Sequence, residues 1–251
     1  MTDEGDYTEC PYCGKRLLMR LYESPLKANG EKSDPWRLGY EPCDCEGAEA
    51  ERKAAEQAEK EKERKAREVQ YLADIRAAGI PKRYERATHE DADKVAERVK
   101  QGCGWYIFGP QGTGKTTLAM AAARKLIWQL PRSSRKVFVV SSYDLMEAMR
   151  SIGKEDKDLI NRAKSCAVLV IDDLGKEASN TPHACERLFS IIDTRDKDMR
   201  PTIMTSNYKL SELAQKITEG DAGKSIASRL YASCEQFPLE GKDRRLSDGN
   251  A

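Results

Sequence analysis

Residues 109–116 read GPQGTGKT and fit the pattern G-x-x-x-x-G-K-[S/T] in full. The apolar run WYIF at 105–108 comes directly before them, and the helix-forming run TTLAMAAARKLIWQL begins at Thr116. A glycine-rich turn between a buried strand and a helix lets backbone N–H groups surround a phosphate, and the helix N-terminus adds its positive dipole end. The stretch therefore predicts a loop that binds the phosphates of a nucleotide.

The chemistry of this loop assigns roles to its residues. Lys115 is expected to reach the β and γ phosphates, and the hydroxyl of Thr116 is expected to hold Mg²⁺. The residues expected to bind the nucleotide are Gly109, Pro110, Gln111, Gly112, Thr113, Gly114, Lys115, Thr116 and Thr117.

A second stretch, VLVIDDLG at 168–175, ends an apolar run with two adjacent aspartates. One interpretation is that the strand simply reaches water there. The other is that the strand lies next to the one before the phosphate loop in a parallel sheet. In that case Asp172 holds the metal through water and Asp173 faces the attacking water. Two acids after a strongly apolar run, in a chain that has a phosphate loop, favour the second interpretation.

The rest of the chain from Gly79 onward has the pattern of an α/β domain. Short apolar runs at 105–108, 137–140, 166–171 and 202–204 alternate with stretches of helical spacing. Continuous apolar runs of this length are typical of parallel strands that are covered on both faces. We expect a parallel sheet flanked by helices.

Composition excludes some classes of protein and leaves others open. The chain has 251 residues and a formal net charge of +1, so its overall charge indicates no particular partner. No run approaches the roughly 18 apolar residues of a membrane span, and the acidic start MTDEGDYTEC is unlike a signal peptide. We expect a soluble, cytoplasmic protein.

Four of the eight cysteines lie in the first 45 residues: Cys10, Cys13, Cys43 and Cys45. Clustered thiols in a chain without a secretory signal bind metal more often than they form disulfides. Four thiolates match tetrahedral Zn²⁺ with no open position for catalysis, and such a site would stabilise a module too small to bury a core. The alternatives are free thiols and a redox pair, although a redox C-x-x-C usually begins a helix of a βαβ unit.

The segment 46–78 is rich in Ala, Glu, Lys and Arg and contains favourable i,i+4 pairs such as Glu56–Lys60 and Glu61–Lys65. It predicts a solvated helix whose end, with Val69, Leu72 and Ile75, packs on the next domain. The expected domains are a zinc module at 1–45, a helical linker at 46–78 and a nucleotide-binding domain at 79–251.

Several segments together resemble the AAA+ ATPases of the DnaC/DnaI helicase-loader group and their IstB relatives. They are the phosphate loop, LVIDDLG at 169–175, TSN at 205–207 and AGIPKRY at 78–84, and the resemblance covers about residues 70–245. It implies an ATPase with ATP, Mg²⁺ and Zn²⁺ as cofactors. It also implies that Asn207 orients the lytic water and that Arg229 acts as an arginine finger in a neighbouring copy.

Two departures from the family pattern stand out. Asp173 replaces the glutamate that many AAA+ enzymes have, and the residues after LEGKDRR are too few for the usual helical lid. Arg244 and Arg245 are candidates for a second sensor.

The resemblance also implies partners. We expect a helicase loader that assembles with copies of itself on ATP, binds the replicative helicase through the zinc module and places it on single-stranded DNA. Tyr143 and Tyr208 are candidates for stacking on bases. The alternatives are an IstB-like ATPase that assists a transposase, a zinc adapter that does not hydrolyse ATP, and a small-molecule kinase.

Overall fold

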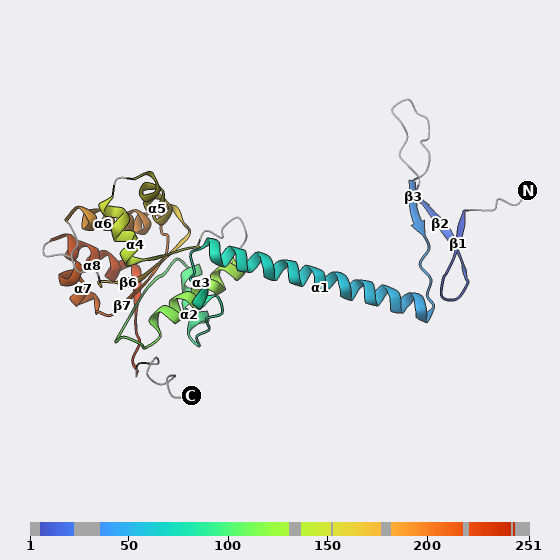
Figure 1. Cartoon of the computed structure of the whole chain (residues 1–251), viewed down its shortest axis with the longest axis horizontal. Coiled ribbons are helices and arrows are strands. Elements are labelled where there is room, and N and C mark those ends of the chain that lie inside the picture. Colours follow the sequence, from blue (N-terminus) through green and yellow to red (C-terminus); the bar gives the residue numbers. More distant parts are fainter. Residues whose placement is uncertain are drawn as a thin grey trace, which may run out of the picture. The chain divides into compact units, whose positions relative to one another are not determined.

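The structure is a computed structural model, and it describes residues 6–22, 36–130, 137–151, 153–176, 182–217, 221–241 and 243. Its contacts group the chain into two compact units, Met1–Glu68 and Val69–Ala251. The boundary falls inside the long helix α1 (Glu46–Ala77; Figure 1). Within the described ranges, no helix has the length and apolar character needed to span a bilayer.

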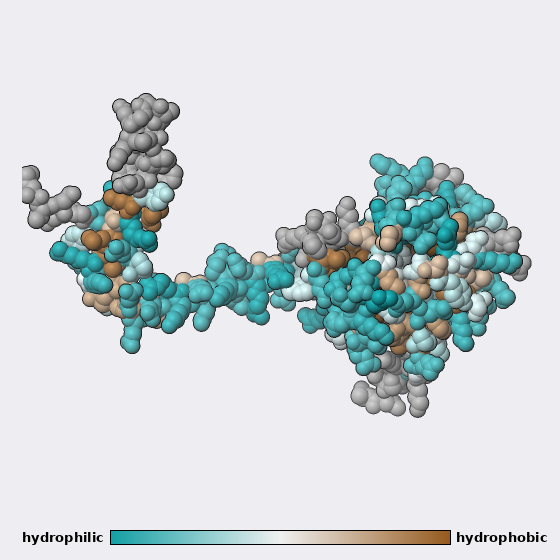
Figure 2. All heavy atoms as spheres, turned by 180° about the vertical axis from the view of Figure 1, so that it is seen from behind, coloured by the Kyte–Doolittle hydropathy of each residue, from teal (hydrophilic) through white to brown (hydrophobic). Residues whose placement is uncertain are grey.

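The N-terminal unit contains an antiparallel sheet in the order β1-β2-β3, formed by Tyr7–Glu9, Arg16–Tyr22 and Trp36–Tyr40. Its buried core consists of Cys10, Cys43 and Ala48. Large apolar side chains such as Leu18 and Leu38 remain 55% and 60% exposed, and Figure 2 shows apolar residues at the surface of this sheet. Three small buried residues provide little hydrophobic stabilisation, which agrees with the expectation of a module that needs a metal.

Helix α1 begins and ends within one residue of the expected segment. The ion pairs Lys60–Glu56 and Lys65–Glu61 lie on its surface, at 2.5 and 3.5 Å. The expected apolar face is only partly right: Ile75 is fully buried, whereas Val69 is 70% exposed. Tyr71 makes the contact instead, because its hydroxyl donates to the Arg124 carbonyl oxygen at 3.1 Å.

The second unit is built on a parallel sheet with the strand order β5-β6-β7-β4-β8. The strands are β4 (Gly104–Phe108), β5 (Val137–Ser141), β6 (Val168–Leu174), β7 (Thr202–Ser206) and β8 (Cys234–Pro238). The expected α/β fold with a parallel sheet is confirmed. Strand β8 was not expected from the sequence, since CEQFP is an edge strand without a continuous apolar run.

Helices cover both faces of this sheet (Figure 1). The helical elements are η1 (Lys82–Tyr84), α2 (Ala92–Lys100), α3 (Lys115–Gln129), α4 (Ser142–Arg150), α5 (Lys154–Ser165), α6 (Pro182–Lys197), α7 (Leu210–Ile217) and α8 (Asp221–Ser233). One buried cluster packs the C-terminal end of α1, together with α2 and α3, against one face of the sheet. The other cluster packs the helices from α4 through α8 against the opposite face. The carboxyl ends of the strands, where parallel α/β sheets bind ligands, meet at one edge.

Candidate nucleotide and metal sites

The phosphate loop connects the end of β4 to the start of α3, as expected. Gly109, Gly112 and Gly114 have φ angles of 150°, 75° and 98°, which glycine adopts more readily than other residues. A β-carbon on Gly109 would lie 2.0 Å from the backbone oxygen of Leu239. The loop therefore needs glycine at this position both for its backbone conformation and for the close approach of the chain after β8.

Lys115 lies inside the loop, with only 5% of its surface exposed. Its Nζ donates to the carbonyl oxygens of Gly109 and Pro110 at 2.8 and 2.6 Å. The hydroxyl of Thr113 donates to the same Pro110 oxygen at 3.0 Å. A phosphate that binds in the loop would therefore compete with two backbone carbonyls for the ammonium group, and its greater charge favours it.

Asp172, at the end of β6, lies beside the start of α3. The hydroxyl of Thr116 donates to its carboxylate oxygens at 3.0 and 3.2 Å. Burial raises the pKa of Asp172, and a hydrogen bond from Thr205 opposes this rise. A hydroxyl and a buried carboxylate are hard oxygen ligands, so these two residues fit Mg²⁺.

The strand arrangement differs from the expectation in one respect. We expected β6 to lie next to β4, but β7 lies between them. The loop still reaches Asp172 because it turns over the end of β7, where the Gly109 N–H donates to the Ser206 carbonyl oxygen at 3.3 Å. The end of β7 is therefore part of the site.

Asp172 and Asp173 occupy a bulge in β6. Ile171 pairs with Met204 and Leu174 pairs with Ser206, so two aspartates lie opposite the single residue Thr205. Asp173 has a left-handed φ of 62°. Its carboxylate is 40% exposed and forms an ion pair with Lys176 at 2.7 Å. The bulge gives the two acids different surroundings: Asp172 is held at the loop, whereas Asp173 is accessible to water.

Three buried hydroxyl groups hold this bulge, and the sequence analysis missed all three. Thr205 contacts both aspartates, Ser142 donates to the Asp173 carbonyl oxygen at 3.1 Å, and Ser206 donates to the Leu174 carbonyl oxygen at 2.7 Å. The motif TSN at 205–207 contains two of them next to Asn207.

The remaining expected site residues are Asn207, Arg229, Arg244 and Arg245. Asn207 directly follows β7 at the same edge of the sheet. Arg229, on α8, forms ion pairs with Asp193 and Asp196 of α6 at 2.9 and 3.4 Å. A role as an arginine finger would require these pairs to open. Arg244 and Arg245 lie outside the described residues.

The two tyrosines proposed for DNA contact differ from each other. Tyr143 is 64% exposed at the start of α4. Tyr208 is partly buried against Gly175 and Lys216, whose Nζ lies 5.3 Å from the ring centroid. Of the two, Tyr143 is the more accessible for stacking.

The N-terminal cysteines come together as expected. The Sγ atoms of Cys10, Cys13, Cys43 and Cys45 all lie within 4.8 Å of one another. Cys10 and Cys45 are 3.7 Å apart and Cys13 and Cys43 are 3.4 Å apart, close to the roughly 3.8 Å between sulfurs of a tetrahedral zinc site. The Tyr12 backbone N–H lowers the pKa of the Cys10 thiol to about 7, whereas the hydrogen bond with Cys43 raises the pKa of the Cys13 thiol to about 12. Without a metal, Cys10 is therefore the thiol that ionises more readily. This cluster fits a structural Zn²⁺ ion.

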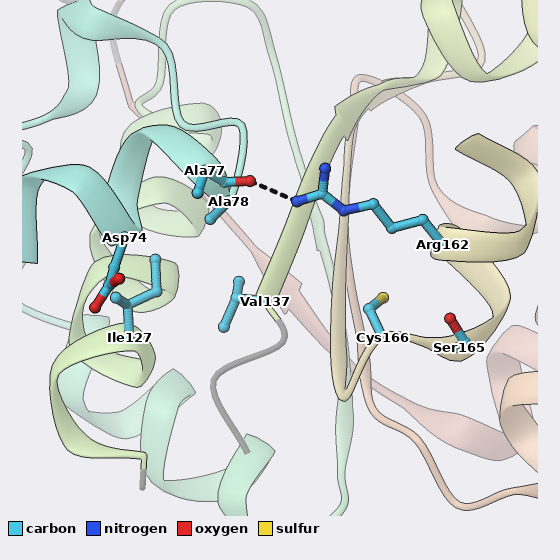
Figure 3. Close-up of a pocket in the computed structure, with 8 residues that line it drawn as sticks. All are labelled: Asp74, Ala77, Ala78, Ile127, Val137, Arg162, Ser165 and Cys166. Carbon is cyan, nitrogen blue, oxygen red and sulfur yellow. Dashed lines mark hydrogen bonds between the residues drawn. The ribbon is translucent and has the colours of Figure 1, made fainter. Parts of the chain in front are cut away.

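A separate pocket of about 210 Å³ lies at the opposite edge of the sheet, near the amino ends of β5 and β6 (Figure 3). Its lining includes Asp74, Val137, Arg162 and Cys166. Arg162 points toward the end of α1 and donates to the Ala77 carbonyl oxygen. This pocket is distinct from the phosphate loop because it opens at the other ends of the strands.

Known proteins are similar to this chain in sequence and in fold. The model of the family described as IstB-like ATP binding protein matches residues 55–250. The replicative helicase loader DnaI of Bacillus subtilis (strain 168) is 25% identical over an alignment of 256 positions, gaps included, that covers 94% of this chain and 78% of that protein.

Solved structures agree. A crystal structure of DnaI is 27% identical, with a TM-score of 0.55 over 64% of this chain and 95% of that chain. The DnaC helicase loader is 23% identical, with a TM-score of 0.51 over 64% of this chain and all of that chain, and supports the fold alone.

Proposed function

This chain belongs to the family of IstB-like ATP-binding proteins, and we propose that it is an ATP-dependent helicase loader. It binds and hydrolyses Mg-ATP, binds the replicative helicase and places it on single-stranded DNA in the cytoplasm. The observation that carries the nucleotide chemistry is the contact of Thr116 with Asp172 directly behind a complete phosphate loop. The resemblance to a replicative helicase loader over 94% of the chain supports the biological role.

Each residue of the site has its own role in binding and hydrolysing ATP. Lys115 leaves the carbonyls of Gly109 and Pro110 and binds the β and γ phosphates. Thr116 and Asp172 would hold Mg²⁺, which would neutralise charge on the phosphates. Asp173, exposed at the bulge, orients the attacking water. Its pair with Lys176 has to open for this role.

Two further residues complete the proposed mechanism. Asn207, at the end of β7, touches the γ phosphate or the water. Arg229 reaches the site of a neighbouring copy and stabilises the charge of the transition state. Since hydrolysis then needs two chains, ATP turnover depends on self-assembly, and ATP acts as a switch between assembled and released states.

The N-terminal unit is the proposed contact for the helicase. Its sheet exposes apolar side chains, among them Leu18, Leu21 and Leu38 at 55%, 58% and 60%. Apolar side chains that a small unit leaves in water are available to a protein partner. Zinc on the cysteine cluster would hold the strands in the conformation that presents them.

The nucleotide assignment is tested with Lys115→Ala. We expect this variant to lose ATP binding, measured by fluorescence with a labelled nucleotide, because the phosphates lose their buried cation. Lys125→Ala is the matched control, since Lys125 lies on the same helix but pairs with Asp93 on the surface. Retained ATP affinity in Lys115→Ala would remove the phosphate-loop assignment.

The partner is tested by light scattering of the chain mixed with the replicative helicase of its host, with and without ATP. A stable complex supports the loader function, and a loading assay on circular single-stranded DNA then follows. The family match favours one other function, an IstB-like ATPase that assists a transposase. Absence of a helicase complex in both nucleotide states, together with binding to a transposase, would favour that function instead.

A further inference from the structure

Thr205 lies at the end of β7, between the phosphate loop strand and β6, and its side chain is fully buried. Its hydroxyl donates to Asp172 Oδ1 at 2.5 Å and accepts the backbone N–H of Asp173 at 2.8 Å. The one hydrogen of this hydroxyl is therefore used on the first aspartate, and a lone pair is used on the second.

The second contact holds a backbone conformation that is uncommon for residues other than glycine. Asp173 has a φ of 62°, in the left-handed region. Its N–H is fixed by Thr205, and its carbonyl oxygen accepts the hydroxyl of Ser142 at 3.1 Å. Two buried hydroxyls from different elements thus hold the backbone N–H and the backbone carbonyl of Asp173 in the bulge.

The same strand offers a comparison. Thr202, at the other end of β7, is also buried, and its hydroxyl accepts a hydrogen bond from Arg195 Nε at 2.9 Å. That threonine supports the packing of α6 on the sheet. Thr205 differs because both of its hydrogen bonds go to the adjacent aspartates of the bulge.

We propose that Thr205 is a positioning residue that turns the Asp172 carboxylate toward Thr116 and the magnesium ion and holds the turn that presents Asp173 to the attacking water. This inference rests on the proposed ATPase function. The single hydroxyl of Thr205 thus fixes both the Asp172 carboxylate, which holds the metal, and the backbone of Asp173, which faces the attacking water. Groups that orient metal ligands in this way change metal affinity or activity by about 10- to 100-fold when they are removed.

The test compares Thr205→Val, which keeps the shape and loses the hydroxyl, with Thr205→Ser, which keeps the hydroxyl. The affinity for a non-hydrolysable ATP analogue is measured without divalent ions and then across a Mg²⁺ titration. Binding of Mn²⁺ to the chain with the analogue is followed by electron paramagnetic resonance. Turnover of ATP is measured on the same samples.

We expect Thr205→Val to bind the analogue in the absence of metal as the wild type does. It should need about tenfold more Mg²⁺ or Mn²⁺ for half-maximal binding, and its kcat should fall by about tenfold or more. Thr205→Ser should restore both values to within about threefold of the wild type, because the hydroxyl returns. Thr202→Val, the same substitution in the same strand, should change neither.

Two results would overturn the inference: a Thr205→Val variant with the metal dependence and turnover of the wild type, or a folded Thr205→Ser variant that restores neither. If Thr205→Val does not fold, Thr205→Ala is measured in the same way, with the same expected and contrary results. A wild-type chain that binds the analogue without any effect of metal would overturn the proposed function as well. The wild-type titration therefore distinguishes the two failures.

Discussion

Arg229 offers a quantitative test of how hydrolysis depends on assembly. In the single chain its guanidinium forms ion pairs with Asp193 at 2.9 Å and with Asp196 at 3.4 Å, and its side chain is 41% exposed. Exposed pairs of this kind contribute about 0.5–1 kcal/mol each, so moving the arginine into a neighbouring site costs about 1–2 kcal/mol. This cost corresponds to a factor of roughly 5–30 in the population of the released arginine.

Two variants move the ATPase rate of the assembled protein in opposite directions. Asp193→Asn combined with Asp196→Asn removes the pairs and should raise turnover by up to roughly 5- to 30-fold. Arg229→Ala should lower it by about 10³-fold, because the transition state loses its cation, and should leave ATP binding intact. Arg200→Ala is the matched control, since Arg200 forms a comparable surface pair with Asp198.

The decisive assay mixes two inactive chains. Arg229→Ala chains keep an intact phosphate loop, and Lys115→Ala chains keep the arginine. If Arg229 acts on a neighbouring copy, the mixture regains ATP turnover at the interfaces where a complete loop faces an intact arginine. Wild-type turnover in Arg229→Ala alone, or a mixture as inactive as its components, would contradict a role in the neighbouring site and leave Arg229 as a surface link between α8 and α6.

Three further expectations concern the metal sites and the loop. Removing zinc with a chelator should cost the N-terminal unit about 10 kcal/mol and abolish its protection from hydrogen exchange. Cys45→Ser, which removes one of the four ligands, should weaken zinc binding and reduce this protection, whereas ATP affinity and a Cys103→Ser control should be unaffected. Protection that persists without metal would contradict a structural zinc site. Gly109→Ala should lower Tm by roughly 5–10 °C, because its methyl group meets the backbone oxygen of Leu239. Gly102→Ala, which has open space around its β-carbon, should lower Tm by less. Equal decreases in Tm would show that the contact with Leu239 does not matter. Burial raises the pKa of Asp172, so the ionised carboxylate destabilises the folded chain at neutral pH. Asp172→Asn should therefore raise the metal-free Tm by about 2–4 °C while abolishing turnover. A lower Tm in this variant would contradict the destabilising effect of the buried charge.

Much of the fold was predictable because its signals are local. The phosphate loop lies between a strand and a helix whose apolar patterns are visible in the sequence, and α1 follows from helix formers and i,i+4 pairs. Strand β8 was missed because an edge strand of mixed polarity depends on β4 for its conformation. Val69 was misplaced for a related reason: which side of α1 is buried depends on where Arg124 and its helix lie.

In the candidate site, too, some features follow from the local sequence and others depend on the fold. Its chemistry follows from residue types that can be read along the chain: a lysine and a threonine in a glycine loop, two carboxylates after a buried strand, and four thiols in two pairs. Three features depend on tertiary contacts: β7 separates β4 from β6, the two aspartates lie in a bulge, and Thr205 holds both of them. Residue types and their spacing follow from local sequence, whereas strand order, register and the partner of a buried hydroxyl depend on segments that are distant in the chain.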